Sequence, residues 1–410
     1  MRYDQPFEKG AVIGSLGKDV TPAARIQTSI EIIDCVLAGD AAERALTNWA
    51  RRSRFAGSGD RYAVRDLVFD ALRRQRSYAW LGGGKTGRAV MLGRCRAQSL
   101  DPEVYFSGAR YAPVPLDDFE RKAPASLEEA PVAVRCDVQD WVLPLLVASL
   151  GEDADNILAR MRDRAPVFLR SNSLKCTREE AIEVLREDGF DACSHSLAET
   201  AIMVEGNSRK LSAAKAVRDG LVEFQDASSQ AVVDRLSAFL PDASVLDFCA
   251  GGGGKTLAVA AYKPKLLIAN DLSKSRMGNI DERAARAGAQ IIKTTKPEGL
   301  FDLVICDAPC SGSGAWRRQP DAKWRLNTKK LKKFVSTQAE ILSTAKMSVL
   351  PGGHLAYITC SLLRQENEER IAHFLSQNRD WTKIDQFKLT PLSDGDGFYL
   401  AVMRAPSTIR

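Results

Sequence analysis

Apolar side chains recur at helical spacing along the first part of the chain. They return every three or four residues in two segments, at Ile26, Ile30, Ile33 and Leu37 and again at Val64, Leu67, Val68 and Leu72. This spacing places apolar side chains on one face of a helix. We therefore expect residues 1–150 to form an all-helical domain.

The pattern changes after Ala165. PVFLRSNSL predicts a strand, CTREEAIEVLREDGF a helix that Thr177 caps, and TAIMVEG a second strand. These elements predict a small α+β module over residues 151–225. The next segment, QDASSQAVVDRLSAFL, predicts an amphipathic helix that leads into a third domain.

From Ser244 onward, short apolar segments alternate with helical patterns. The apolar segments are SVLDFCA, KLLIAND, FDLVICDAP, HLAYITC and GFYLAVMR. Such alternation predicts a mostly parallel sheet with helices on both faces, and these sheets bind ligands at the carboxyl ends of their strands. We expect a Rossmann-like α/β domain over residues 226–410, with its functional residues just after the strands.

Composition narrows the class of protein. The chain has 410 residues, of which 45% are hydrophobic and 27% charged, which is ordinary for globular domains and too long for one core. No apolar stretch approaches the roughly 20 residues that cross a bilayer, and MRYDQPFEKG lacks the apolar core of a signal peptide. Nine cysteines without a C-x-x-C pair and three histidines favour neither a disulfide framework nor a zinc site. We expect a cytoplasmic protein without a membrane or metal partner and, by default, a monomer.

A glycine-rich loop follows the first strand of the predicted sheet. After Asp247 the sequence continues as FCAGGGGKT, where glycines allow close approach of the backbone and the next helix offers unpaired N–H groups. Cys249 stands where a P-loop needs glycine, and no G-x-G-x-x-G fingerprint fits. Asp271 ends the second strand, where an acid accepts hydrogen bonds from ribose hydroxyls. Together these features predict a ribose-bearing cofactor; a structural turn and a helix cap are the alternatives.

Two cysteines follow other strands of the same sheet. Asp307 and Cys310 leave one strand in FDLVICDAPCSGSG, and Cys360 ends another in YITCS. Because the carboxyl ends of parallel strands meet at one edge, both thiols can point into one crevice. Each cysteine alone could be a small buried side chain, which is our interpretation of Cys306. A thiol-redox pair is a further alternative, although no C-x-x-C motif supports it.

These motifs resemble those of a known family. DAPCSGSGAWRRQPDAKWR and YITCSLLRQENEERI, with DFCAGGGGKT upstream, resemble the S-adenosylmethionine-dependent RNA cytosine methyltransferases of the NOL1/NOP2/Sun family, and within it the bacterial Fmu/RsmB group that acts on 16S rRNA. FLRSNSLKCTREEAIEVL resembles the RRM-like module of that group, and the helical N-terminus resembles its NusB-like RNA-binding domain. Two segments depart from the family pattern. Gly251 and Gly252 replace alanine and proline, and IIKTTKPEG lacks the acidic residue that the family places against adenine.

The resemblance implies methylation of carbon 5 of a cytosine in RNA. Carbon 5 is a poor nucleophile, and addition of a thiolate to carbon 6 makes it a better one. The resemblance assigns this attack to Cys360, release of the carbon 5 proton to Cys310, and an acid or hydrogen-bond donor at N3 to Asp307. In DNA cytosine methyltransferases the attacking cysteine follows a proline, which would nominate Cys310 instead.

The resemblance also implies S-adenosyl-L-methionine as the cofactor. Its predicted binding residues surround the glycine loop and the strand ends: Asp247, Cys249, Ala250, Gly251, Gly253, Lys255, Asp271, Arg276 and Asp307.

Basic side chains interleaved with tryptophans predict the RNA contacts, because they suit phosphates and stacked bases. The candidates are Arg317, Arg318, Lys323 and Trp324, with Arg170 of the small module. A net charge of +6 allows such a partner. Small-subunit rRNA is the expected substrate. The alternatives are tRNA, 23S rRNA, and a catalytically inactive RNA-binding ribosome assembly factor.

Overall fold

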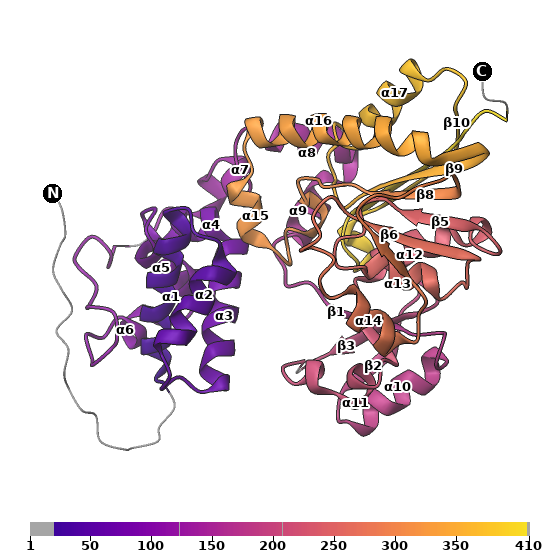
Figure 1. The fold of residues 1–410 in the computed structure, drawn as a ribbon. Coiled ribbons are helices and arrows are strands. Elements are labelled where there is room, and N and C mark those ends of the chain that lie inside the picture. The colour runs from indigo at the N-terminus through magenta and orange to yellow at the C-terminus, as the bar shows by residue number, and fades with distance from the viewer. Residues whose placement is uncertain (1–19, 123, 207, 408–410) are drawn as a thin grey trace.

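An N-terminal helical bundle opens the computed structural model, which describes residues 20–122, 124–206 and 208–407 (Figure 1). The N-terminal segment MRYDQPFEKG, which the sequence predicts not to be a signal peptide, lies outside these residues. The helices of this part are α1 (Pro22–Leu37), α2 (Ala42–Arg52), α3 (Ser58–Arg73), α4 (Gln75–Gly82), α5 (Gly87–Ala97) and α6 (Pro102–Tyr105). The apolar faces of α1 and α3 meet in one core with Met91 of α5, as their spacing predicted. The expectation of a helical N-terminal part is confirmed.

Three short helices join this bundle to the rest of the molecule. They are α7 (Val132–Arg135), α8 (Leu143–Leu150) and α9 (Ala154–Arg160). Their apolar residues, including Leu146 and Leu158, share a core with Trp316 and Leu362 from far along the chain. These helices therefore pack on the C-terminal part, and the predicted domain boundaries stay predictions.

A four-stranded antiparallel sheet forms the small module. Its elements are β1 (Val167–Ser171), α10 (Arg178–Glu187), β2 (Asp191–Ser194), β3 (Ala201–Glu205), α11 (Lys215–Arg218) and β4 (Val222–Phe224), with strand order β2-β3-β1-β4. Thr177 caps α10 as predicted, in a capping box with Glu180. The amide of Asn172 donates to the carbonyl of Ala287 at 2.8 Å, which ties the module to the next domain.

The C-terminal part contains a seven-stranded mixed sheet. Its strands are β5 (Ser244–Asp247), β6 (Leu266–Asn270), β7 (Ile292–Thr294), β8 (Phe301–Asp307), β9 (Val349–Thr359), β10 (Thr382–Leu389) and β11 (Phe398–Arg404). The order is β10-β11-β9-β8-β5-β6-β7, and β5 to β9 run parallel. This is the expected Rossmann-like α/β fold.

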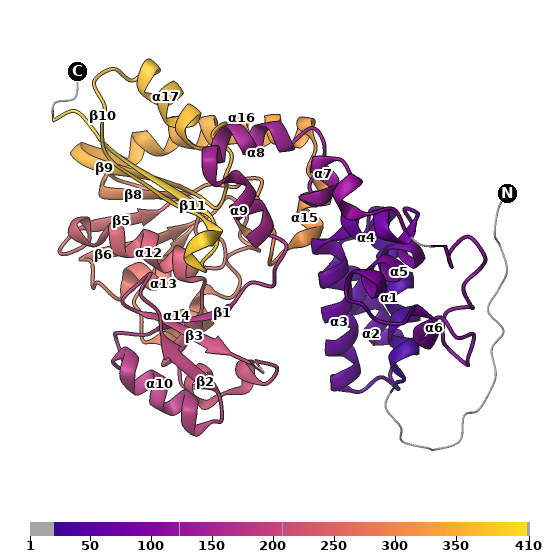
Figure 2. The same ribbon diagram turned by 180° about the vertical axis from the view of Figure 1, so that it is seen from behind.

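Helices cover both faces of this sheet (Figures 1 and 2). They are α12 (Ala227–Arg235), α13 (Gly254–Ala260), α14 (Ile280–Ala287), α16 (Thr328–Ala345) and α17 (Glu368–Gln377). The short helix α15 (Pro320–Arg325) lies beside the N-terminal bundle instead (Figure 1). Alternate residues of β8 point to opposite faces, so that Ile305 joins the core under α12 and α13 while Cys306 joins the core under α16 and α17. Among the described residues, no helix is long and apolar enough to span a membrane.

Candidate active site

Four strand ends meet at one edge of the large sheet. β5 lies between β6 and β8, and β8 lies beside β9, all in parallel. Asp247 and Asp307 are the last residues of their strands, and Cys360 directly follows β9. This edge also contains the point where the strand order reverses, which is the usual ligand-binding position in such sheets.

The two candidate cysteines are in contact at this edge. Cys310 Sγ and Cys360 Sγ are 3.4 Å apart, and both thiols are partly buried and free. The hydrogen bond to Cys360 and burial both hold the pKa of Cys310 well above its usual value. Cys310 therefore keeps its proton and can donate it toward Cys360 when Cys360 ionises. Cys306, by contrast, is fully buried in the core, as interpreted from the sequence.

A buried carboxylate joins the two cysteine-bearing turns. Glu366 accepts hydrogen bonds from the Ser311 amide at 2.8 Å, from Ser361 Oγ at 2.5 Å, and from Ser311 Oγ. Gln338 Nε2 donates to it at 3.0 Å, and Glu366 is completely buried. Because Ser311 and Ser361 directly follow the two cysteines, Glu366 fixes the position of each thiol relative to the other.

Lys255 and Asp307 form an ion pair beside the cysteines. Lys255 Nζ lies 2.7 Å from Asp307 Oδ2 and 4.9 Å from the centre of the Phe398 ring. Burial by itself lowers the pKa of Lys255. The negative charge of Asp307 and the hydrogen bond to Asp307 raise it by more, so the pKa of Lys255 is higher than its usual value. Lys255 thus places a stable positive charge at the edge of the candidate site.

The glycine loop between β5 and α13 is held by Asp271, the acid that directly follows β6. The Gly251 amide donates to Asp271 Oδ2 at 3.1 Å, and Arg276 Nη1 pairs with the same carboxylate at 3.1 Å. Gly253 has a φ of +79°, and a Cβ there would lie 2.9 Å from Ile280 Cγ1. A side chain at Gly253 would therefore be strained and would collide with α14.

Asp247 is the most buried carboxylate of the loop region. Thr256 Oγ1 donates to its Oδ2 at 2.6 Å, whereas Oδ1 has no partner among the described residues. Burial raises the pKa of Asp247 to about 7. Burial also raises the pKa of Cys249, which makes that thiol a poor nucleophile. Cys249 would therefore contact a ligand only through its backbone.

These residues fit a cofactor with an ammonium group and ribose hydroxyls. A buried oxygen without a partner needs a hydrogen-bond donor. Two such acceptors lie at the loop, Asp247 Oδ1 and the amide oxygen of Asn270, and neither has a donor among the described residues. Gly251 and Gly253 both have a positive φ, a backbone conformation that glycine adopts without strain. Among the described residues, no cluster of His, Cys, Asp or Glu could hold a metal ion.

The expected RNA contacts of three basic residues stay predictions, and in the structure their side chains are buried and bonded to other parts of the chain. Arg317 is fully buried, pairs with Asp396 at 3.3 Å and donates to the carbonyls of Asp394 and Gly395. Lys323 donates to the carbonyl of Arg73 at 3.0 Å, and burial lowers its pKa to about 8.

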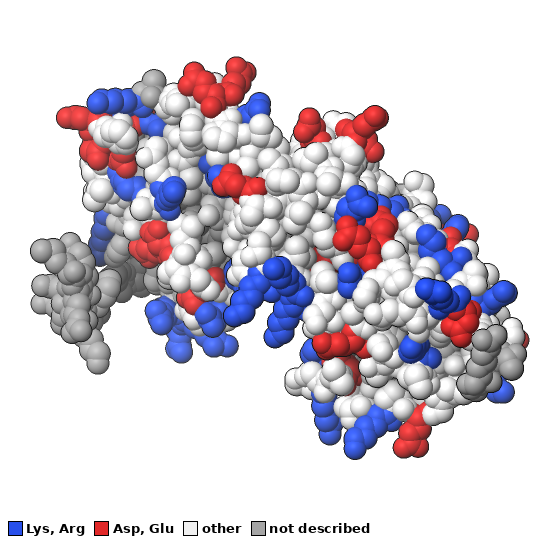
Figure 3. Space-filling view, turned by 90° about the horizontal axis from the view of Figure 1, so that it is seen from above, with Lys and Arg blue, Asp and Glu red and all other residues white. Residues whose placement is uncertain are grey.

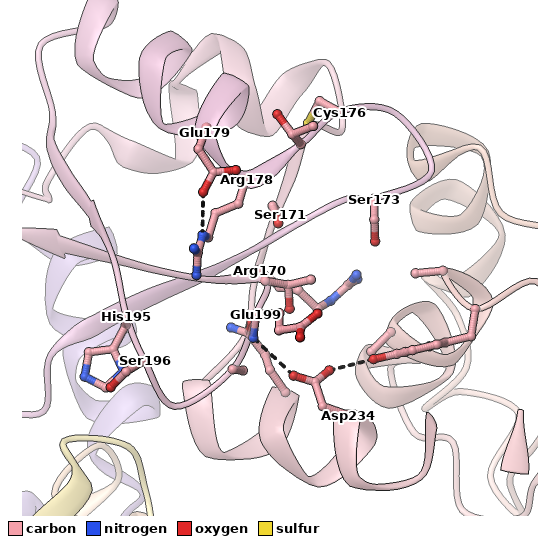
Figure 4. Close-up of a pocket in the computed structure, with 17 residues that line it drawn as sticks. Arg170, Ser171, Ser173, Cys176, Arg178, Glu179, His195, Ser196, Glu199 and Asp234 are labelled. Atoms are coloured by element: carbon pink, nitrogen blue, oxygen red, sulfur yellow. Dashed lines mark hydrogen bonds and ion pairs between the residues drawn. The ribbon is translucent and has the colours of Figure 1, made fainter. Parts of the chain in front are cut away.

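Arg170 is the third buried residue. It donates to Gln225 Oε1 at 2.7 Å, and burial lowers its pKa to about 10. Figure 4 shows it within a 600 Å³ pocket between the small module and α12, among Ser171, Ser173 and Asp234. The residues that line this pocket include neither candidate cysteine.

The other two RNA candidates are partly buried. Arg318 forms ion pairs with Asp226 and, at 2.7 Å, with Asp396, so it joins structural elements. Trp324 Nε1 donates to the carbonyl of Leu72 at 2.7 Å, which links α15 to α3. The segment predicted to contact RNA therefore holds the N-terminal bundle against the C-terminal part.

Sequence reasoning did not assign a role to Glu366 or Thr256. Glu366 lies in the ENEER segment after Cys360, and Thr256 follows Lys255, so both were adjacent to motifs that had been singled out. A glutamate close behind a catalytic motif is also typical of an exposed helix start, and only its burial shows otherwise.

Two family models match the chain. The model described as 16S rRNA methyltransferase RsmB/F matches residues 236–404, and the ferredoxin-like domain model of RsmF/B-like methyltransferases matches residues 139–209. The second match covers most of the antiparallel module. Both agree with the sheets seen in the structure.

Curated relatives and solved structures give the same picture. Ribosomal RNA small subunit methyltransferase B of Citrobacter koseri is 30% identical over 308 residues, which cover 70% of this chain and 71% of that protein. The protein of the same name from Yersinia enterocolitica is 30% identical over 285 residues, and the match spans 65% of its length.

Among solved structures, PH0851 has a TM-score of 0.76 at 22% identity, covering 94% of this chain and all of that one. NSun6 from Pyrococcus horikoshii, crystallised with SFG, has a TM-score of 0.59 at 17% identity, covering 66% of this chain and 99% of that one. These two structures share the fold.

Proposed function

Because this chain belongs to the RsmB/F family of 16S rRNA methyltransferases, as its cysteine motifs predicted, we propose that it methylates carbon 5 of a cytosine in small-subunit rRNA. The membership implies S-adenosyl-L-methionine as the cofactor. The observation that carries the proposal is the contact between Cys310 and Cys360, 3.4 Å apart at the strand edge that binds ligands in this fold. Two thiols with different tasks are what this chemistry needs.

The chain offers a complete set of cofactor contacts at the glycine loop. Asp247, with its unpaired oxygen, would accept from the ammonium group, and Asp271 would accept from ribose hydroxyls. The backbone of Cys249, Ala250, Gly251 and Gly253 would border the cofactor, and the amides of Ala250, Gly251 and Gly253 hold the loop in shape by donating to protein acceptors. Arg276 and Lys255 add positive charge near Asp271 and Asp307. When bound, the cofactor supplies the methyl group as a sulfonium.

Cys360 is proposed to attack carbon 6 of an unpaired cytosine. Its thiolate would form the C–S bond, and the electron pair displaced toward the ring would activate carbon 5. Asp307, which accepts a hydrogen bond from Lys255 Nζ at 2.7 Å, would face the N3 edge, and a proton taken up by its carboxylate would be donated there where charge develops. The base must leave its stack first, at a cost of a few kcal/mol.

Cys310 is proposed to remove the carbon 5 proton. Its pKa is raised chiefly by the hydrogen bond to Cys360, with burial and the charge of Cys360 adding to it. Once Cys360 is bonded to carbon 6 it no longer carries that charge, so the pKa of Cys310 falls. Cys310 can then ionise, accept the proton, directly or through water, and allow Cys360 to leave as a thiolate.

The test uses the wild-type protein, Cys360→Ala and Cys310→Ala with labelled S-adenosylmethionine and RNA from cells that lack the enzyme. Cys360→Ala should lose both methyl transfer and the denaturant-resistant protein–RNA adduct, whereas Cys310→Ala should accumulate the adduct. Cys35→Ala, at an exposed cysteine of α1, is the matched control and should behave as wild type.

Each other outcome has a definite meaning. If Cys310→Ala loses the adduct and Cys360→Ala keeps it, the two roles are reversed. If wild type methylates tRNA or 23S rRNA in place of 16S rRNA, the chemistry stands and the substrate is corrected. If wild type methylates neither protein-free RNA nor assembled subunits, the protein is an RNA-binding assembly factor.

A further inference from the structure

A large groove lies between the N-terminal bundle and the C-terminal part. It has a volume of 1230 Å³ and is lined by α4, by the chain around α7 and by α15, which stand beside one another in Figure 1. A pocket for a small ligand usually encloses about 300–1,000 Å³. The groove therefore suits a segment of a polymer better than a metabolite.

Three tryptophans from three separate elements line this groove. Trp80 belongs to α4, Trp324 to α15, and Trp141 to the segment between α7 and α8. Each indole N–H group donates to a protein acceptor. Trp80 donates to Ser126 O at 3.1 Å, Trp324 to Leu72 O at 2.7 Å, and Trp141 to Gln139 Oε1 at 2.9 Å. The rings are thus fixed in orientation. Lys323 Nζ lies 4.5 Å from the centre of the Trp324 ring, and Trp324 also packs against the core of the bundle, so Trp80 and Trp141 offer a ligand most of the aromatic surface.

The polar atoms of the groove favour an anionic ligand with hydrogen-bond donors. The two acids that line it are already paired, Asp140 with Arg76 and Asp321 with Arg325, each at 3.0 Å. Lys85 and Lys330 also line it, are exposed, and have no ion pair within the described part of the chain. Lys330 Nζ donates to the carbonyl of Arg325 at 2.8 Å, which leaves two of its three N–H donors for a ligand.

The positive charge continues beyond the groove. The exposed lysines at the start of α16, Lys329, Lys332 and Lys333, extend the charge of Lys330 along the helix. Figure 3 shows Lys and Arg side chains gathered where the two parts of the molecule meet. Gln75, at the start of α4, lines the groove with an amide oxygen that is buried and has no partner among the described residues.

We propose that this groove binds a single-stranded segment of RNA, with bases stacked on the tryptophans and phosphates held by Lys85 and Lys330. Aromatic platforms bordered by cations are how proteins hold single strands without sequence preference. A duplex would not fit this role, because its bases are already stacked and hidden. The site is distinct from the cysteine edge, none of whose residues line it, and it depends on the proposed function only for the identity of the natural RNA.

The test measures binding of a fluorescein-labelled single-stranded oligoribonucleotide to the full-length protein by anisotropy, at several salt concentrations. Trp80→Leu should weaken binding by about fivefold to a hundredfold, which corresponds to the loss of one stacked base. The double variant Lys85→Ala, Lys330→Ala should lower the slope of log K against log salt by about 1.4, or about 0.7 for each lost phosphate contact. A double-stranded RNA of equal length should bind more weakly and leave tryptophan fluorescence unquenched.

The matched control removes two exposed lysines from elsewhere, in Lys265→Ala, Lys296→Ala, and should retain wild-type affinity. The proposal is overturned if wild type does not bind the single strand, or if the groove variants bind it as wild type does. It is also overturned if the groove variants keep their affinity for the single strand but bind ribosomal proteins more weakly than wild type does, because the groove would then be a protein-binding site. A wild-type protein that binds the single strand but transfers no methyl group would refute the proposed function and leave this proposal standing.

Discussion

Replacing Glu366 by glutamine should lower both the stability of the catalytic domain and the rate of methyl transfer. Glu366 is fully buried and accepts four hydrogen bonds, from the backbone and side chain of Ser311, from Ser361 and from Gln338. Glutamine keeps nearly the same shape, so the change removes charge without opening a cavity. Its oxygen can still accept two of these bonds, while its NH₂ group must donate to serine hydroxyls that would have to turn.

The loss in the free energy of unfolding can be worked out from these four hydrogen bonds. A hydrogen bond to a charged group contributes about 1.5–3 kcal/mol and a neutral one about 0.5–1.5 kcal/mol, so each bond loses about 1 kcal/mol. The total is about 4 kcal/mol, a large part of the roughly 5–15 kcal/mol that stabilises a domain. For a domain of this size, that loss lowers the melting temperature by about 8–16 °C.

A second readout separates a positioning role from a purely structural one. The charge of Glu366 contributes to the raised pKa of Cys310, after the hydrogen bond to Cys360, burial and the charge of Cys360. Removing a negative neighbour favours the thiolate, so the rate of Cys310 alkylation should begin to rise at lower pH in Glu366→Gln.

Calorimetry and a pH series of alkylation, followed by mass spectrometry, measure the two effects. Glu340→Gln, on the exposed face of α16, is the control. A melting temperature within about 2 °C of wild type, where about 8–16 °C is expected, would refute the reasoning. So would an unchanged alkylation profile.

Three other changes test the cofactor side of the site. Lys255→Met should lower the free energy of unfolding by about 1.5–3 kcal/mol in a denaturant titration, because the partly exposed Asp307 carboxylate loses a charge-assisted hydrogen bond of 2.7 Å, and an equal free energy of unfolding would contradict this. Asp247→Asn should raise the melting temperature of cofactor-free protein more at about pH 8 than at about pH 5. Asp247 binds a proton in the folded state up to a pKa of about 7 but not in the unfolded chain above about 4, so wild type loses stability as pH rises through that range. In calorimetric titrations the same variant should bind S-adenosylmethionine more weakly. Gly253→Ala should also weaken that binding, at least tenfold, since its φ of +79° and the 2.9 Å approach to Ile280 force the loop to move.

Much of the catalytic domain was predictable because its signals are local. In the parallel part of the sheet, the strands that carry site residues are apolar runs that end at or just before such a residue, as FDLVICD ends at Asp307. Parallel strands bring such ends to one edge whatever the loops between them do. The side-chain pattern of Thr177 and Glu180 likewise determines where α10 begins.

The surface of the molecule was predicted less well. Arg317 and Lys323 lie in a basic segment with tryptophans, a composition that fits RNA contact. Their partners, Asp396 and the carbonyl of Arg73, are 79 and 250 residues away along the chain. A local pattern of charges carries no information about acceptors that far away, so exposure was assumed where burial is found.

The sequence by itself determined the fold class, the family and the residues that could react, because hydrophobic spacing and motif chemistry are properties of neighbours along the chain. Only the tertiary structure decided which of those residues meet. It brought two thiols 50 positions apart to 3.4 Å, placed Glu366 between their turns, and buried the basic segment against α3. Contacts of this kind depend on how whole elements pack, and packing is set by every residue in the core at once.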